Sequence, residues 1–223
     1  MISLDVVGDS YSDEEHMFFP QTDKRKDINK TYLELLREKD IEIKNYSWHG
    51  IGASQAIEKL KNISMNNENL LFILPQIRRI KFNNSQDENV SNEYARYKNN
   101  ELPNDQMFKY HNIFSTTLFD MYDTLCLTYV FNYSEIYKKI FIWPVVPNPF
   151  LGLVNIPSNC HVANKPLNAI TNEEPKQSDK NRNNHLLPEN HKIVSDILYD
   201  YFIDNKVPKF DNFVGTYNEF IYE

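Results

Sequence analysis

Cysteine and glycine are both scarce in this chain of 223 residues. Its two cysteines, Cys126 and Cys160, are too few for a disulfide framework or a zinc cluster, and they are compatible with a reducing compartment. No two histidines have the His-x-x-x-His spacing of a helical metal site, and no glycine-rich loop is followed by Lys and Ser or Thr. We therefore expect no metal ion and no other cofactor.

An excess of positive charge and a long apolar run are also absent. The net charge is −7, and the basic groups at residues 24–26 and 78–79 are scattered among acids, which argues against a nucleic-acid partner. The longest apolar runs, "LLFILP" and "IFIWPVVP", are the length of strands, so we expect no membrane span.

The beginning of the chain has no basic segment followed by an apolar one, which predicts that there is no signal peptide and that the protein is cytoplasmic. The composition is biased toward Asn, Lys, Ile and Tyr, as in proteins of AT-rich genomes such as viral ones. A viral origin would place the protein in the host cytoplasm or in the virion. The oligomeric state does not follow from the sequence.

Segments with the pattern of strands alternate along the chain with amphipathic segments, which predicts an α/β fold with a parallel sheet in one domain over residues 1–223. The expected strands are residues 2–7, 41–47, 69–75 and 138–146, and the expected helices are residues 27–39, 53–62, 106–136 and 187–202. A polar insertion at about 83–105 and a long irregular loop at about 148–184 interrupt this pattern.

Three of the expected helices have predicted caps or buried faces. The first is capped by Asp27 or Asn29 and buries Tyr32, Leu35 and Leu36, and the second is opened by Gly52. The third buries a stripe, and the fourth turns Ile193, Ile197, Leu198 and Tyr201 inward. The stripe consists of Phe108, Ile113, Phe114, Leu118, Met121 and Leu125.

The stretch "VVGDSYSD" ends the first expected strand with Gly8, Asp9 and Ser10. One interpretation is turn chemistry, because Gly allows positive φ and Asp and Ser cap a following helix. The other is a serine nucleophile at the carboxyl end of a first strand, where open α/β sheets place their ligands. The acids that follow, Asp13 to Glu15, have the pattern of a solvated run or of the first turn of a helix.

Two later stretches complete a pattern with "VVGDSYSD". They are "NYSWHGIGAS", after the second expected strand, and "NHLLPENHKIVSDIL", at the last expected helix. In this order and approximate spacing the three stretches resemble the motifs of the SGNH (GDSL-type) hydrolases, over most of residues 2–203. The resemblance implies a three-layer α/β/α, flavodoxin-like fold with its active site at the carboxyl ends of the strands.

The resemblance also implies roles for individual residues. Ser10 corresponds to the nucleophile that attacks an ester carbonyl, and its backbone N–H stabilises the oxyanion. Gly52 offers a second N–H for the oxyanion, with Gly50 as the alternative. His185 corresponds to the general base, and His191 to the second, non-catalytic histidine of the family.

Two positions depart from the family pattern. The family has Gly-x-Asn-Asp after the third strand, whereas this chain reads "ILPQIRR", so Gln76 or Arg78 would have to replace the oxyanion Asn. The family's orienting Asp stands three residues before the catalytic His, and here that position is Arg182. Asp179 is our first choice for the orienting group, Asn183 is the second, and a backbone carbonyl is a third.

We therefore expect a serine esterase that acts through an acyl-enzyme, with a small-molecule or glycan ester as its substrate. Short acyl esters such as acetylated sugars are the preferred substrates, since no apolar helix resembles a lid for a lipid tail. Trp48, Trp143 and Arg78 are candidate substrate-binding residues. Acyl transfer to a sugar would use the same residues. The alternative is a decayed SGNH-like module with a binding or structural role, for example in a virus particle.

Overall fold

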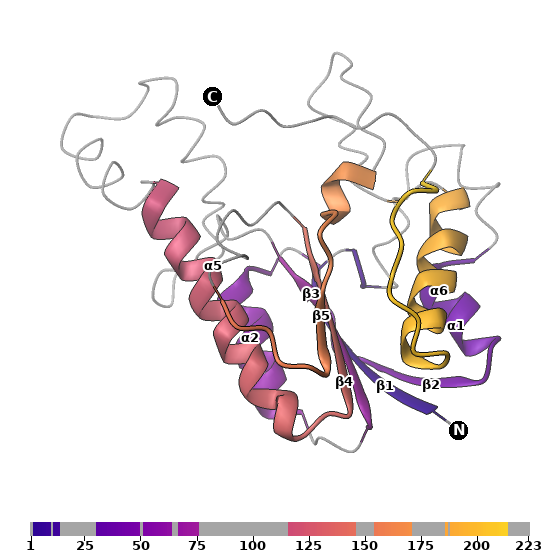
Figure 1. Cartoon of the computed structure of the whole chain (residues 1–223), viewed down its shortest axis with the longest axis horizontal. Helices are drawn as coiled ribbons and strands as arrows, with labels where there is room; N and C mark the ends of the chain where they lie inside the picture. Colours follow the sequence, from indigo (N-terminus) through magenta and orange to yellow (C-terminus); the bar gives the residue numbers. More distant parts are fainter. Residues whose placement is uncertain are drawn as a thin grey trace, which may run out of the picture.

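A five-stranded, all-parallel sheet forms the centre of the molecule (Figure 1). The structure is a computed structural model, and it describes residues 2–9, 11–13, 30–49, 51–63, 67–75, 116–145, 154–170, 186 and 188–213. The strand order is β2-β1-β3-β4-β5. The strands are β1 (Ile2–Val7), β2 (Ile41–Asn45), β3 (Asn69–Leu74), β4 (Lys139–Pro144) and β5 (Cys160–Val162).

The sheet confirms the predicted α/β class and the four expected strands. The fifth strand was missed, because β5 lies inside the segment predicted to be an irregular loop at 148–184. β5 has three residues, and among the described strands it pairs with β4 alone. A strand this short has no readable alternation, and its partner, rather than its own sequence, makes it a strand.

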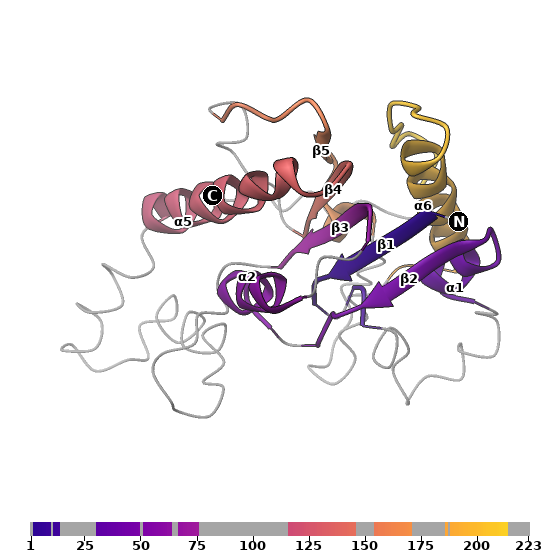
Figure 2. The same cartoon turned by 90° about the horizontal axis from the view of Figure 1, so that it is seen from below.

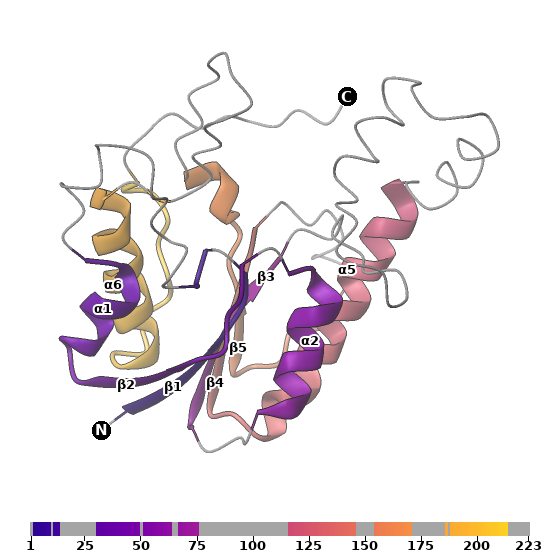
Figure 3. The ribbon, with the colours of Figure 1, turned by 180° about the vertical axis from the view of Figure 1, so that it is seen from behind.

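Helices pack on both faces of the sheet, as Figures 2 and 3 show. On one face lie α1 (Tyr32–Arg37) and α6 (Pro188–Phe202), and on the other lie α2 (Ala53–Asn62) and α5 (Thr116–Phe131). Two short 3₁₀ helices, η2 (Asn132–Glu135) and η4 (Leu167–Ile170), follow α5 and β5.

Each central strand supplies side chains alternately to two hydrophobic clusters. In β3, Leu71 and Ile73 belong to the cluster under α1 and α6, while Leu70, Phe72 and Leu74 belong to the cluster under α2 and α5. Every residue of β3 is buried. A strand covered on both faces has to be apolar on both faces, which explains the uninterrupted run "LLFIL".

The first helix begins later than predicted. Its N-cap is Thr31 and not Asp27 or Asn29, and Thr31 and Glu34 form a capping box through their side chains and backbone N–H groups. Tyr32, Leu33 and Leu36 are buried, so Leu33 takes the place that was predicted for Leu35. The capping-box pattern Thr31-x-x-Glu34 marks the start of this helix, and the Asp and Asn residues that precede it do not.

The predicted stripe of α5 is wrong at Leu125, which is 65% exposed. The buried face runs instead through Cys126, Leu127 and Val130. This helix is apolar around most of its circumference, so the sequence does not fix which face is buried. Phe108, Ile113 and Phe114, the side chains of Leu118 and Met121, and the polar insertion at 83–105 lie outside the described part of the chain.

A carboxylate is buried in the middle of β1. Asp5 is fully buried, and it accepts hydrogen bonds from Tyr137 Oη at 2.8 Å and from Asn67 Nδ2 at 2.6 Å. Burial raises the pKa of Asp5 despite these two donors and the charge of Lys44. Burial and the hydrogen bond to Asp5 also raise the pKa of Tyr137, which therefore remains a hydrogen-bond donor.

The carboxyl end of α6 is held by a lysine from β4. Lys139 Nζ donates to the backbone carbonyls of Tyr201 and Phe202 at 2.9 and 2.7 Å. These carbonyls have no partner within their own helix, so the cation satisfies them and opposes the helix dipole. The chain that follows α6 returns to the core, where Phe210 and Phe213 pack against Trp143.

None of the helices within the described residues has the length and apolar character needed to cross a membrane.

Replacing Asp5 by Asn tests the burial of this carboxyl group. Asn has the shape and the donor–acceptor pair of the protonated acid, so both proteins should be about equally stable near pH 4. The raised pKa means that the folded state holds the proton more tightly than the unfolded state does. Wild type should therefore lose free energy of unfolding as the pH rises from about 4 through the folded-state pKa, while Asp5→Asn should not.

Urea unfolding at several pH values measures this difference, and Asp211→Asn controls for the loss of a charge at an exposed position. If wild type instead gains stability relative to Asp5→Asn as the pH rises, the hydrogen bonds to Asp5 lower its pKa by more than burial raises it.

Candidate active site at the carboxyl ends of β1 and β2

The chain makes a compact turn directly after β1. The carbonyl oxygen of Asp9 accepts the backbone N–H groups of Ser12 and Asp13, both at 3.0 Å, and the Ser12 hydroxyl at 3.3 Å. The Asp9 side chain accepts the backbone N–H of Tyr11 at 3.1 Å. Asp9 is 2% exposed, so its carboxylate stabilises the turn through a buried hydrogen bond.

Gly8 allows this turn to lie close to β3. A Cβ atom at position 8 would stand 2.5 Å from Ile73 Cβ and 2.4 Å from Ser12 Oγ. Neither distance leaves room for a methyl group, so glycine is required here by close packing. The turn-chemistry interpretation is correct in part, since Asp9 does bond to the backbone of its own turn.

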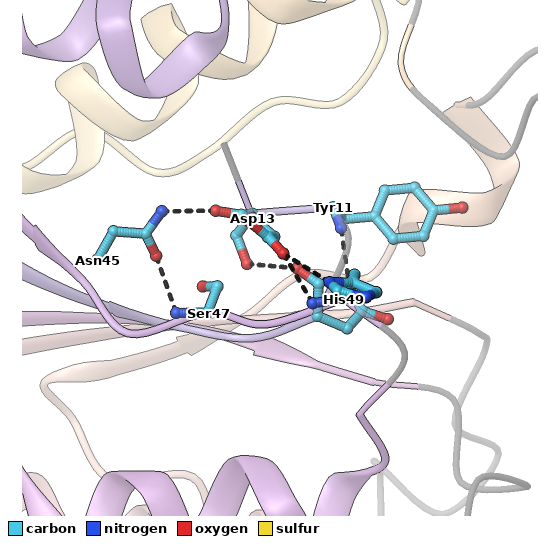
Figure 4. A network of polar contacts seen from close by, with 7 residues as sticks. Tyr11, Asp13, Asn45, Ser47 and His49 are labelled. Atoms are coloured by element: carbon cyan, nitrogen blue, oxygen red, sulfur yellow. Dashed lines mark hydrogen bonds and ion pairs between the residues drawn. The ribbon is translucent and has the colours of Figure 1, made fainter. Parts of the chain in front are cut away.

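The loop after β2 is joined to this turn by hydrogen bonds, which Figure 4 shows in part. The backbone N–H of Trp48 donates to the carbonyl of Gly8 at 3.1 Å. The Asn45 side chain donates to the carbonyl of Ser12 at 2.7 Å and accepts the N–H of Ser47 at 3.0 Å. Because β1 and β2 are parallel neighbours, both loops leave the same edge of the sheet and reach each other.

An aspartate and a histidine face each other across these loops (Figure 4). Asp13 Oδ2 accepts the backbone N–H of His49 at 2.8 Å and lies 3.3 Å from His49 Nδ1. The Asp13 side chain is 11% exposed, whereas that of His49 is 45% exposed. The prediction that Asp13 belongs to a solvated run or to the first turn of a helix is wrong, because Asp13 is in no helix and its carboxylate is buried against the second loop.

Trp48 lies beside this pair at the surface. Its side chain is 56% exposed and stacks on His49, with ring centroids 5.7 Å apart and an angle of 19° between the planes. Lys59 Nζ, from α2, lies 5.3 Å from the centroid of the Trp48 ring. Trp48 is therefore a partly exposed ring next to polar groups, and its substrate-binding role stays a prediction.

Trp143 has no such surface. It is fully buried, and its Nε1 donates to the carbonyl of Lys165 at 2.8 Å. The prediction that Trp143 binds substrate is therefore wrong, because the ring belongs to the core under α6.

Gly52 is the N-cap of α2, as predicted, but its N–H already has an acceptor. It donates to Gln55 Oε1 at 3.0 Å, which satisfies the first backbone donor of the helix. For this N–H to stabilise an oxyanion, the Gln55 side chain would first have to move away.

His191 has a structural position. It is 2% exposed, its Nδ1 accepts the backbone N–H of Tyr32 at 3.2 Å, and its ring stacks on the Tyr32 ring. This histidine in α6 thus holds the start of α1, which agrees with the non-catalytic role that the resemblance implies.

Most of the predicted site lies outside the residues that the structure describes. Ser10, Gln76, Arg78, Asp179 and His185 belong to this group, as do the alternatives Gly50 and Asn183. Among the predicted residues, the structure therefore places Gly52 and Trp48, both after β2, and Trp143 and His191, which are buried in β4 and α6.

Sequence reasoning missed Asn45 and the pairing of Asp13 with His49. His49 had no predicted role, and Asp13 was predicted to lie in a solvated run or in the first turn of a helix. The two are 36 positions apart, so only the parallel pairing of β1 with β2 shows that they meet. Over the described ranges, no three His, Cys, Asp or Glu side chains gather closely enough to hold a metal ion.

A scan against protein-family models finds no match to this chain, and a search of curated proteins finds no relative.

Gly8→Ala tests the close approach of the turn to β3. The added methyl group should lower the free energy of unfolding by about 1–3 kcal/mol, the usual cost of overpacking a filled site. Thermal and urea unfolding of the purified variant measure this loss. A variant as stable as wild type would show that the turn does not lie against Ile73 as closely as described.

Proposed function

We propose that the protein is a serine ester hydrolase of the SGNH type, acting through an acyl-enzyme. The observation that carries the proposal is the hydrogen bond from Trp48 N–H to the Gly8 carbonyl. It joins the loop that contains Gly8-Asp9-Ser10 to the loop that leads to Gly52, at one edge of the sheet. The resemblance requires these two loops to meet, because one supplies the nucleophile and the other an oxyanion donor.

The fold supports the same proposal. A parallel sheet in the order 2-1-3-4-5 with helices on both faces is the arrangement of flavodoxin-like, doubly wound domains. In such sheets ligands bind beyond the carboxyl ends of the strands, where the connections on either side run to opposite faces. β1 stands between β2 and β3 in this order, so the segment after β1 is at that position.

The proposed reaction has two steps. Ser10 Oγ forms a bond to the ester carbonyl carbon while a histidine takes the hydroxyl proton, and that proton leaves with the alcohol when the ester C–O bond breaks. Water then adds to the acyl-enzyme and releases the acid and free Ser10. The resemblance assigns the base to His185 and two oxyanion donors to the N–H groups of Ser10 and Gly52. At the two positions that depart from the family pattern, we propose Asp179 as the orienting group and the side chain of Gln76 as the third oxyanion donor.

The substrate we propose is a short acyl ester of a polar alcohol. The Trp48 ring is partly exposed beside His49 and Lys59, and aromatic rings stack well on the apolar side of a sugar ring. Acetylated carbohydrates have both a sugar ring that can stack on Trp48 and a small acyl group.

A non-catalytic binding module is the second candidate, and one observation favours it. The N–H of Gly52 is bonded to Gln55 and not directed to a substrate. A module that only binds glycans would keep Trp48 and have no need of this donor.

Covalent labelling tests the proposed nucleophile. Wild type should react with a fluorophosphonate probe and hydrolyse p-nitrophenyl acetate, and peptide mapping should find the probe on Ser10. Ser10→Ala should lose both reactions with an unchanged melting temperature. A folded Ser10→Ala variant that hydrolyses the ester as fast as wild type would remove the serine hydrolase proposal.

Two substitutions of Gln55 test whether Gly52 is an oxyanion donor. Gln55→Ala frees the Gly52 N–H from a hydrogen bond whose net contribution is about 0.5–1.5 kcal/mol, so kcat/KM should rise by about 2- to 10-fold. Gln55→Glu keeps the acceptor and adds a negative charge near the oxyanion, so kcat/KM should fall. Steady-state kinetics on p-nitrophenyl acetate measure both. A fall in Gln55→Ala would contradict the assignment of Gly52.

A further inference from the structure

We propose that residues 205–213, which follow α6, form a strap that opens when His161 is protonated. The strap has no regular secondary structure, and it runs back along α6 as the yellow coil of Figures 1 and 3. Two of its side chains, Phe210 and Phe213, are buried, with 7% and 8% of their surface exposed. The strap belongs to the fold itself, whether or not the protein is an esterase.

The strap packs on Trp143, near the end of β4. The Phe210 and Phe213 rings meet the Trp143 ring edge to face, with centroids 5.5 and 6.4 Å apart. Lys165 Nζ donates to the Phe210 carbonyl at 3.1 Å and lies 5.7 Å from the centroid of the Phe213 ring. The Trp143 indole in turn donates to the Lys165 carbonyl at 2.8 Å. Opening of the strap would therefore expose this indole N–H to water.

His161, in β5, contacts the strap from the side of the sheet. Its ring stacks on that of Phe210, with centroids 6.3 Å apart and an angle of 16° between the planes. The rings of Phe141 in β4 and Tyr201 in α6 have their centroids 5.2 and 5.7 Å from that of His161. The imidazole thus lies among three aromatic rings, one of which belongs to the strap.

One nitrogen of this imidazole is placed where a proton would be costly. Nε2 of His161 is buried and, within the described ranges, makes no hydrogen bond. A neutral imidazole tolerates this position, because its unprotonated nitrogen can lie there. The protonated ring carries a hydrogen on both nitrogens, so it would bury a charged N–H donor with no acceptor. An unsatisfied buried donor is costly, and a charged one costs more.

The groups around the ring do not offset this cost. Among the described residues, no carboxylate pairs with His161, and burial lowers its pKa. The cations of the neighbouring elements are Lys165 and Lys139, whose Nζ lies 5.6 Å from the centroid of the Tyr201 ring. Burial raises the pKa values of Tyr201 and of Cys160, the residue before His161, so both stay neutral where histidine titrates.

The charged residues of the strap itself are at the surface. Lys206, Lys209 and Asp211 are all exposed. Lys206 also forms ion pairs with two carboxylates that precede the strap. Water and salt screen such exposed charges, so they have little effect on the buried nitrogen of His161.

Of the three rings around His161, that of Phe210 is the most easily displaced. Phe141 belongs to a strand with a partner on each side, and Tyr201 Oη donates to two backbone carbonyls at 3.0 and 3.2 Å. Phe210 belongs to a segment without regular hydrogen bonding, and such segments open locally at low cost. Opening lets water reach Nε2, so protonation and opening favour each other.

The sign of the pH dependence follows from linkage. In the open state His161 has its ordinary pKa of about 6.5, and in the closed state burial lowers that pKa. The closed strap is therefore fully favoured above about pH 6.5, and it loses free energy as the pH falls toward the closed-state pKa. Between the two pKa values, the opening constant should rise about tenfold for each unit by which the pH falls.

Hydrogen exchange of the Trp143 indole N–H, followed by NMR in the full chain, measures the opening constant. The observed rate is divided by the exchange rate of free indole at the same pH. The backbone N–H of Phe72 in the fully buried strand β3 reports opening of the sheet as a whole. Trp143 should have a larger opening constant than Phe72, and the Trp143 constant should rise as the pH falls.

Three variants identify the group that titrates. His161→Phe keeps a flat ring against Phe210 but binds no proton, so its opening constant should not change with pH. His161→Gln removes the same proton site with a smaller polar side chain, and its opening constant should also be independent of pH. His49→Gln, at an exposed histidine outside the strap, is the matched control and should keep the wild-type pH dependence.

Opening that increases with acid in wild type and in His49→Gln, but not in the two His161 variants, supports the strap as a pH-sensitive element. The wild-type pH dependence in His161→Phe overturns it, because another group then controls opening. A wild-type opening constant that does not change with pH overturns it as well. Equal opening constants for Trp143 and Phe72 also overturn it, because the strap then opens only when the sheet does.

Discussion

Parallel pairing of β1 with both β2 and β3 is the constraint on which the rest of the structure depends. Parallel neighbours cannot be joined by a hairpin, so the chain has to cross a face of the sheet between them. Helices therefore cover both faces, and each central strand has to be apolar on both sides. The same pairing brings the carboxyl ends of β1 and β2 together, and with them the two loops of the candidate site.

Asp5 and Lys139 meet specific partners that lie far away in the sequence. Asp5 in β1 is held by Tyr137 and Asn67, and Lys139 in β4 holds the carbonyls at the end of α6. Each partnership links an element to the sheet through a group whose burial is costly when it is unpaired. These contacts fix the position of α6 and the segment before β4 more specifically than apolar packing does.

The candidate site combines a sequence signal with a geometric one. Gly8-Asp9-Ser10 is readable as a motif, and the structure explains Gly8 and Asp9 by the packing and hydrogen bonds of the turn. The contact between Asp13 and His49 has no motif, and it exists because two parallel strands end side by side. The motif thus predicts a nucleophile, and the geometry adds a contact that the motif does not contain.

Local chemistry in the sequence determined the four longer strands, the position of α2 with its glycine cap, and the burial of Ile197 and Leu198 in α6. These features follow from apolar runs, capping residues and helical periodicity, which act over a few neighbouring residues. Only the tertiary structure decided that β5 is a strand, that Leu125 faces outward, that Asp13 is buried and that Trp143 belongs to the core. Each of these outcomes depends on a partner many positions away, such as β4 for β5 and His49 for Asp13, and local periodicity carries no information about such a partner.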